Sequence, residues 1–161
     1  MKAEFRTIEE RDNKQLATII RAVFREFKID KPGTVYTNPA TDDLYSLFQK
    51  EGSTYLVAEV DGKLVGGCGI FPTEGLPAGC AELVKFYLSA EVRGQGLGLR
   101  LLQASLVLAK ELGYQTLYLE SFPGLAKAIA MYQKAGFQFI PQALGNSGHG
   151  ACTVWMLLEL G

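Results

Sequence analysis

The sequence is poor in residues that bind metals or form disulfides. It has three cysteines, Cys68, Cys80 and Cys152, which form no C-x-x-C pair, and His149 is its single histidine. Because structural zinc sites are built from clusters of cysteine and histidine, no metal site is predicted. Scattered cysteines without a pairing pattern are typical of reduced thiols, so the cytoplasm is the expected location.

Long apolar runs and blocks of like charge are also absent. No apolar run approaches the roughly 20 residues needed to cross a bilayer. The first residues, Met1–Arg6, lack the apolar centre of a signal peptide. Lys and Arg number 16 against 17 Asp and Glu, a formal net charge of −1. Without a basic block, neither nucleic acid nor a membrane is an expected partner.

The size and composition indicate one folded domain spanning residues 1–161. With 48% hydrophobic and 20% charged residues, the chain resembles an ordinary globular protein with a substantial core. Strand-like patterns cover residues 2–8, 55–60, 63–71, 83–88 and 116–120, a short segment from 137, and 152–160. Helical spacing covers residues from 12 or 13 to 27, 44 to about 52, 97–112 and about 123–134.

This order of elements predicts an α/β fold. A β-hairpin followed by β-α-β-α-β segments implies a mixed sheet of six to seven strands, with about four helices distributed over both of its faces. Glycines at 66, 67 and 69 in one strand predict a bulge or a close backbone approach.

The chain is organised around a glycine-rich segment between a strand and a helix. Residues 83–88 are an apolar strand, and Arg93-Gly94-Gln95-Gly96-Leu97-Gly98 leads into a helical pattern. The first N–H groups of a helix lack internal partners, and the helix dipole adds partial positive charge there. Glycines also let a phosphate approach the backbone. A phosphate site is predicted; the alternative is a glycine-rich turn without a ligand.

Two common phosphate motifs do not fit this segment. A Walker loop requires G-x-x-x-x-G-K-[ST], which the chain lacks. A dinucleotide loop requires G-x-G-x-x-G, but Leu99 stands where the third glycine would be. Five residues also separate the strand from the first glycine, so a Rossmann site is not expected.

Two motifs resemble the GCN5-related N-acetyltransferase (GNAT) family. Arg93-x-x-Gly96-x-Gly98 is similar to its R/Q-x-x-G-x-G/A motif, and residues 128–137 resemble its A-x-x-x-Y-x-K-x-G-F helix end. Together with the element order, the likeness covers nearly the whole chain. It implies that acetyl-CoA binds with its pyrophosphate on the loop amides. The residues expected to bind the cofactor are Leu88, Arg93, Gly94, Gln95, Gly96, Leu97, Gly98 and Lys134. Arg93 and Lys134 would balance the charge of CoA phosphates; the alternative for each is an ordinary surface charge.

Three residues are candidates for catalysis. By resemblance, Glu82 is the general base at the start of the central strand, and Tyr132 hydrogen-bonds the departing sulfur. The alternative for Glu82 is a strand-end carboxylate that faces water or pairs with Lys85. The alternative for Tyr132 is a tyrosine that only packs in the core. His149 lies in a polar glycine loop, where it contacts the acceptor, acts as the base or is simply solvated.

These features predict an acetyl-CoA-dependent N-acetyltransferase. The acetyl group would pass to a primary amine of a small molecule or peptide by direct attack in a ternary complex, since no cysteine falls in a motif. The alternatives are a non-catalytic acyl-CoA-binding sensor and transfer to a hydroxyl acceptor. Relatives in the resembled family often dimerise, so a homodimer is a further expectation. The acceptor itself has no readable sequence code.

Overall fold

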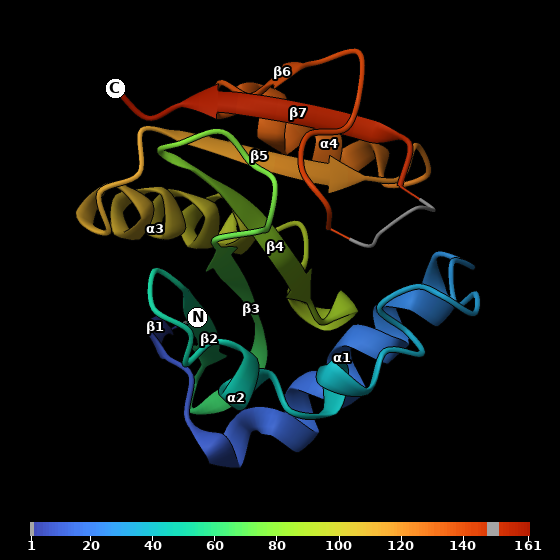
Figure 1. The fold of residues 1–161 in the computed structure, drawn as a ribbon. Helices are drawn as coiled ribbons and strands as arrows, with labels where there is room; N and C mark the ends of the chain where they lie inside the picture. The colour runs from blue at the N-terminus through green and yellow to red at the C-terminus, as the bar shows by residue number, and fades with distance from the viewer. Residues whose placement is uncertain (1, 148–151) are drawn as a thin grey trace.

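The computed structural model describes residues 2–147 and 152–161, which form one mixed sheet with helices on both faces (Figure 1). The sheet has seven strands in the order β1-β2-β3-β4-β5-β7-β6. Each neighbouring pair in the described sheet is antiparallel except β4 and β5, which are parallel. The predicted fold class is confirmed.

The elements follow the predicted order. The strands are β1 (Ala3–Thr7), β2 (Thr54–Val60), β3 (Lys63–Phe71), β4 (Cys80–Leu88), β5 (Thr116–Ser121), β6 (Gln138–Phe139) and β7 (Val154–Glu159). The α-helices are α1 (Asn13–Glu26), α2 (Leu44–Leu47), α3 (Leu97–Glu111) and α4 (Ala126–Lys134). Short 3-10 helices are η1 (Glu10–Asp12), η2 (Pro39–Asp42) and η3 (Ala90–Val92).

Some boundaries differ from the sequence-based expectation. Strand β4 begins at Cys80 rather than at Leu83, so Glu82 lies inside the strand. Helix α4 begins at Ala126 rather than near Pro123, because the backbone first makes a turn in which Leu125 N donates to Phe122 O at 3.0 Å. Helix α2 is a single turn instead of the expected longer helix.

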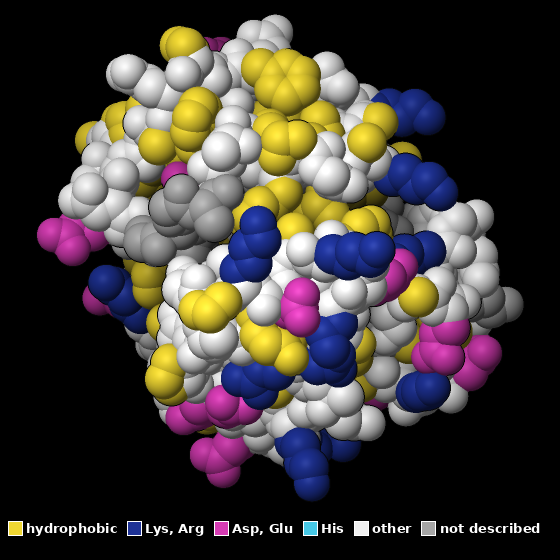
Figure 2. Space-filling view, turned by 90° about the vertical axis from the view of Figure 1, so that its right-hand side faces the viewer, with side chains coloured by type: hydrophobic (Ala, Val, Ile, Leu, Met, Phe, Trp, Pro, Cys, Tyr) yellow, Lys and Arg dark blue, Asp and Glu magenta, His cyan; other side chains and the backbone are white. Residues whose placement is uncertain are grey.

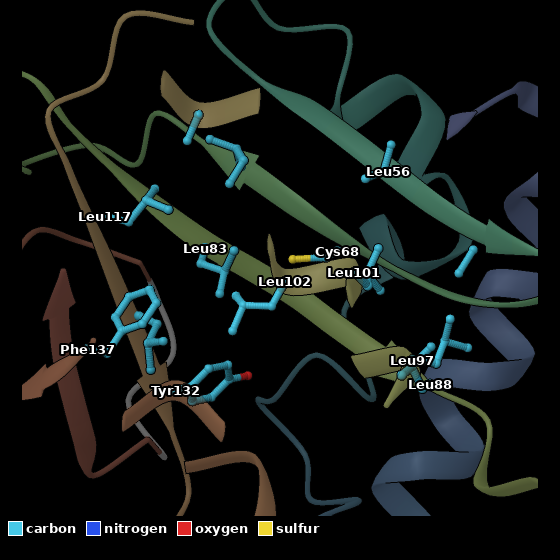
Figure 3. Packing of buried hydrophobic residues seen from close by; sticks show 14 of the residues in the cluster. Leu56, Cys68, Leu83, Leu88, Leu97, Leu101, Leu102, Leu117, Tyr132 and Phe137 are labelled. Carbon is cyan, nitrogen blue, oxygen red and sulfur yellow. The ribbon is translucent and has the colours of Figure 1, made fainter. Parts of the chain in front are cut away.

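The side chains of the sheet divide between two cores, as alternation along strands requires. Leu83, Leu117 and Leu119 pack with α3 and α4 on one face (Figure 3). Tyr55 and Val84 pack with α1 and α2 on the other face.

Two irregularities shape the middle of the sheet. Gly67 and Gly69 of β3 pair with Tyr87 and Val84, so β4 contains one more residue than β3 between these pairs. The extra residue makes a bulge at Lys85, whose φ is +52°. A Cβ on Gly67 would lie 2.3 Å from the ring of Tyr55, which confirms the predicted close approach.

Strands β4 and β5 separate soon after they meet. Cys80, Ala81 and Glu82 pair with Thr116, Leu117 and Tyr118. Beyond these pairs, β4 runs on to Leu88 and β5 to Ser121 with no further pairing between the two in the described sheet. Their facing backbone groups are therefore available to another partner.

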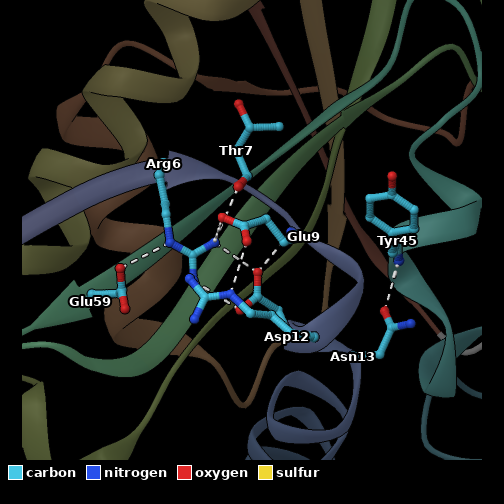
Figure 4. A network of polar contacts seen from close by, with 8 residues as sticks. Arg6, Thr7, Glu9, Asp12, Asn13, Tyr45 and Glu59 are labelled. Atoms are coloured by element: carbon cyan, nitrogen blue, oxygen red, sulfur yellow. Dashed lines mark hydrogen bonds and ion pairs between the residues drawn. The ribbon is translucent and has the colours of Figure 1, made fainter.

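A buried ion pair ties the first strand to the first helical turn (Figure 4). Arg6 donates to both oxygens of Asp12 at 2.8 and 2.9 Å and to Glu59 of β2 at 2.9 Å. Asp12 also accepts from Glu9 N at 2.8 Å, which completes a capping box before α1. Within residues 2–147 and 152–161, no helix combines the length and apolar character that crossing a bilayer requires.

Replacing Asp12 with Ala should lower the free energy of unfolding by about 1.5–3 kcal/mol, since charge-assisted bonds to Arg6 are lost. Burial alone would raise the pKa of Asp12, but the bonds from Arg6 and Glu9 N outweigh it, so the pKa lies below its usual value. The carboxylate therefore stabilises the fold above about pH 4 and progressively less below it. Urea unfolding at pH 7 and pH 3 measures both effects.

The matched control is Asp42→Ala, which removes the exposed pair between Asp42 and Arg21. Exposed pairs contribute about 0–1 kcal/mol. The interpretation of Asp12 is wrong if its replacement costs no more than the replacement of Asp42, or if its cost does not shrink at low pH.

Candidate active site

A cavity of about 1020 Å³ lies where β4 and β5 separate. Its walls come from β4, the end of β5, the glycine segment before α3, helix α4, and α1 with the loop at residues 33–35. The space-filling view of this side shows a hollow floored by apolar side chains, with Lys and Arg side chains along its edge (Figure 2). A cavity of this size and composition is typical of a small-molecule site.

The glycine segment forms one end of the cavity. Gly94 and Gly96 have φ of +77° and +79°, and Gly96 is the residue before the first turn of α3. No atom lies within 4 Å of a Cβ built on either glycine, so the backbone is approachable there. A Cβ on Gly98 would lie 3.3 Å from Met131 Sδ, so this glycine lets α3 approach α4. Unpaired N–H groups at the start of α3 suit a phosphate.

Arg93 holds this segment against its neighbours. Its guanidinium donates to Leu88 O at 2.9 and 3.2 Å, pairs with Glu26 of α1 and lies 5.2 Å from the ring centre of Phe27. The side chain thus connects the end of β4 to α1, and this positions the loop in addition to supplying charge.

Most of the expected cofactor-binding residues line the cavity. Leu88, Arg93, Gly94, Gly96, Gly98 and Lys134 belong to its walls. Gln95 is exposed and Leu97 is buried in the core at 1% exposure, so neither side chain lines the cavity.

Glu82 is buried at 2% exposure and lines the same cavity. Thr73 donates to its Oε1 at 2.6 Å, while its Oε2 accepts no hydrogen bond from the described side chains. Burial raises the pKa of Glu82 to about 7, and the charge of Glu120 adds to the rise, against the opposing effects of Thr73 and Lys85. The carboxylate is buried from solvent and forms no ion pair with Lys85 in the described structure.

Glu120 is a second acid in the cavity wall that the sequence analysis did not assign to the site. Tyr118 donates to its Oε2 and Ser147 to its Oε1, each at 2.6 Å. Because Tyr118 pairs in register with Glu82, the parallel strands bring both acids to one end of the cavity. The sequence carries no local signal for this placement, which depends on the register of the two strands.

Tyr132 lies between the core and the cavity. Its ring packs at right angles to Phe86, with centres 6.1 Å apart, and against Phe137 at 5.9 Å. In Figure 3 its hydroxyl points away from Phe137. No hydrogen bond joins this hydroxyl to the described residues, and burial raises its pKa, so it stays protonated and free to donate to a ligand. The third candidate, His149, lies outside the described residues.

Comparison with known proteins identifies the fold and family. The model of the acetyltransferase (GNAT) family matches residues 18–137. The chain belongs to the GNAT acetyltransferase family. An uncharacterised N-acetyltransferase of Escherichia coli K12, YjgM, is 40% identical over 151 residues, which cover 92% of this chain and 90% of YjgM.

Solved structures of GNAT proteins share the fold. A GNAT-family acetyltransferase of Staphylococcus aureus Mu50 superposes with a TM-score of 0.87 at 17% identity, covering 99% of this chain and 100% of that chain. A phosphinothricin acetyltransferase of Sinorhizobium meliloti, solved in complex with AcCoA, gives a TM-score of 0.77 at 22% identity, covering 100% and 90%. The predicted resemblance and the predicted enzyme class, N-acetyltransferase, are confirmed.

Replacing Gly96 with Val should abolish the thermal stabilisation that CoA gives to the wild type. A β-branched residue at positive φ costs on the order of 1–3 kcal/mol and disturbs the loop backbone. At a hundredfold excess over Kd, CoA should stabilise the wild-type GNAT domain by about 2.7 kcal/mol, and NAD or ATP by less. Thermal unfolding with and without each ligand measures this.

Gly113→Val is the matched control. Gly113 follows the other end of α3, has φ of +93° and also has no atom within 4 Å of a built Cβ. Both variants should lose similar stability without ligand, but Gly113→Val should keep the CoA shift. An equal CoA shift in the two variants, or a larger shift of the wild type with NAD than with CoA, would contradict the assignment of the loop.

Proposed function

We propose that this enzyme transfers the acetyl group of acetyl-CoA to a primary amine of a small molecule or peptide, by direct attack within a ternary complex. The observation that carries the proposal is one cavity with a glycine phosphate loop at one end and the buried Glu82 at the other. Acetyl-CoA supplies the activated thioester, and the roles below belong to residues of the chain.

The unpaired edges of β4 and β5 fit the pantetheine arm of CoA. Each edge presents N–H and C=O groups that lack a strand partner, and the arm contains two amides that can pair with them. The start of α3 with Gly94 and Gly96 then receives the pyrophosphate, and Lys134 on the cavity wall adds positive charge. The thioester would lie between β4 and Tyr132.

Glu82 suits the role of general base. A primary amine of pKa about 10.4 is neutral in roughly one molecule per thousand near neutral pH, so attack requires removal of a proton. A base works best when its pKa is near the working pH, and the pKa of Glu82 is about 7. Thr73 occupies Oε1, which leaves Oε2 to take the proton directly or through a water.

Tyr132 suits the role of hydrogen-bond donor to the departing sulfur. A phenol whose pKa is raised by burial is a weaker acid than a thiol of about 8.5, so it stabilises the thiolate by donation rather than by full proton transfer.

The cysteines favour direct attack over an acetyl-enzyme. Burial raises the pKa of Cys68 and of Cys152 to about 12 and raises that of Cys80 as well. A cysteine nucleophile reacts as the thiolate, which these environments suppress at neutral pH.

Replacing Tyr132 with Phe should lower kcat by roughly tenfold or more and leave the Kd of CoA nearly unchanged. The lost hydrogen bond matters most as charge develops on sulfur, whereas the ground-state contact is weak. Because the hydroxyl has no partner among the described residues, the free energy of unfolding should change by less than about 1 kcal/mol. Steady-state kinetics, CoA titration and urea unfolding measure the three quantities.

Tyr114→Phe is the control, since its hydroxyl donates to Gly52 O at 2.6 Å away from the cavity walls. It should cost about 1 kcal/mol of stability and leave kcat unchanged. Unchanged turnover with a large stability loss in Tyr132→Phe would instead support a purely structural tyrosine.

Replacing Glu82 with Gln should reduce kcat/KM by roughly 10²–10⁴-fold near neutral pH. In the wild type, kcat/KM should rise with pH through an apparent pKa near 7, because Glu82 must lose its proton to act as the base. The deficit of the variant should shrink at higher pH, where more of the amine is already neutral. Initial rates from pH 5.5 to 9.5 test this, with the exposed Glu111→Gln as control.

The same assay separates the proposal from its alternatives. A sensor module would release no CoA with any acceptor in either form, and a hydroxyl acceptor would be consumed where amines are not. A deficit under threefold, with a pH profile parallel to that of the wild type, would remove the base role from Glu82.

A further inference from the structure

Lys85 is an unusual residue in the cavity wall. Three non-glycine residues of the described chain have positive φ, and Lys28 and Asp61 lie in turns. Lys85 instead lies inside strand β4, at the bulge, three residues after Glu82. A non-glycine residue held in this conformation within a strand is strained, and such strain persists where surrounding structure imposes it, commonly at functional sites. The bulge carries a lysine into the wall of the cavity.

The ammonium group of Lys85 has no counter-ion in the described structure. Its side chain is half-buried, lines the cavity, and makes no hydrogen bond or ion pair with the described residues. Burial lowers its pKa, and the nearby charge of Glu82 offsets part of this effect. Glu82 and Lys85 therefore influence each other without direct contact. A half-buried cation that faces a cavity without a partner favours a negatively charged group on whatever enters.

The adjoining wall is apolar and aromatic. Phe24 of α1 packs against Tyr87 at 5.7 Å and Phe122 at 6.4 Å between ring centres, and all three line the cavity. Val35 lies in the same wall. These residues form the α1 side of the cavity. An acceptor that entered here would bury an apolar group against them.

We infer that the acceptor is an α-amino acid or a close derivative with a free carboxylate and an apolar side chain. Its amine would face Glu82, its carboxylate would pair with Lys85, and its side chain would pack beside Phe24 and Phe122. This inference rests on the proposed function and adds the class of acceptor to it. A small zwitterion would contact Glu82 through its amine and Lys85 through its carboxylate, although these two side chains do not contact each other.

The reaction is balanced without a further reactant. The amine nitrogen forms a bond to the thioester carbonyl carbon, and the carbon–sulfur bond breaks. Glu82 takes the proton that nitrogen loses, and the sulfur leaves as the thiolate of CoA. Glu82 then gives up that proton through solvent and the thiolate gains one, so the carboxylate is regenerated and no proton is left over. The carboxylate on Lys85 is unchanged, so Lys85 is a specificity-determining residue rather than a base.

The test compares L-phenylalanine with 2-phenylethylamine, which has the same ring and amine but no carboxylate. The probes are assayed with wild type, Lys85→Met, Lys85→Arg and the exposed control Lys110→Met. For each enzyme, kcat/KM for phenylalanine is divided by kcat/KM for 2-phenylethylamine. Comparing this ratio between a variant and the wild type cancels the difference in intrinsic reactivity between the two probes. Wild type and Lys110→Met should prefer phenylalanine. Lys85→Met should lose roughly 10- to 100-fold of that preference, the expected contribution of one charge-assisted contact, mainly through KM. Lys85→Arg should recover part of it.

Three outcomes would overturn the inference. Equal probe ratios in wild type and Lys85→Met would show that Lys85 does not read the carboxylate. A wild-type preference for 2-phenylethylamine would exclude a zwitterionic acceptor while leaving amine acetylation intact. The third outcome is acetylation of Lys85 itself during incubation with acetyl-CoA alone, seen as an added acetyl mass in the wild type but not in Lys85→Met. Lys85 would then be an acceptor rather than a specificity-determining residue. If no amine, with or without a carboxylate, is acetylated, the proposed function itself fails.

Discussion

The separation of β4 from β5 after three residue pairs is the feature on which the rest of the site depends. Two parallel strands that kept pairing would use their own N–H and C=O groups and leave no space between them. Here the pairing stops beside Glu82, and the cavity begins where it stops. The same event that frees backbone groups for a ligand therefore also brings a buried acid to the edge of that ligand's space.

The bulge at Lys85 supports this separation from within β4. One extra residue bends the strand and lets Phe86 pack against Tyr132 on the α3 and α4 side, while Tyr87 packs against Phe24 on the α1 side. The carbonyl of Lys85 accepts a hydrogen bond from Tyr55 OH at 2.8 Å, so the strained backbone is held by a buried group. Packing on both faces thus maintains a conformation that the strand would not adopt alone.

Local signals made the fold and the glycine turn before α3 predictable. Gly94 and Gly96 predict a positive-φ turn directly before a helix. The alternation of apolar and polar residues predicts the strands of the sheet. The neighbours of Glu82 were not predictable in the same way. Glu120 lies near Glu82 because of the register between β4 and β5, and Thr73 donates to Glu82 from the folded loop after β3. The glycines of β3 predicted an irregularity at this place in the sheet, but not that the extra residue belongs to β4. Lys85 carries no glycine or proline signal, and only the pairing with β3 reveals the extra residue.

The two oxygens of Glu82 show why burial alone does not make a base. Burial raises the pKa of the carboxyl group toward neutrality, but a group wholly enclosed by donors would have no oxygen left for a proton from the acceptor. Thr73 engages one oxygen and thereby orients the group, while Glu120 adds negative charge that favours the protonated form. Glu120 is in turn held by the hydroxyls of Tyr118 and Ser147. The hydroxyls thus orient both acids, and the charge of Glu120 raises the affinity of Glu82 for a proton.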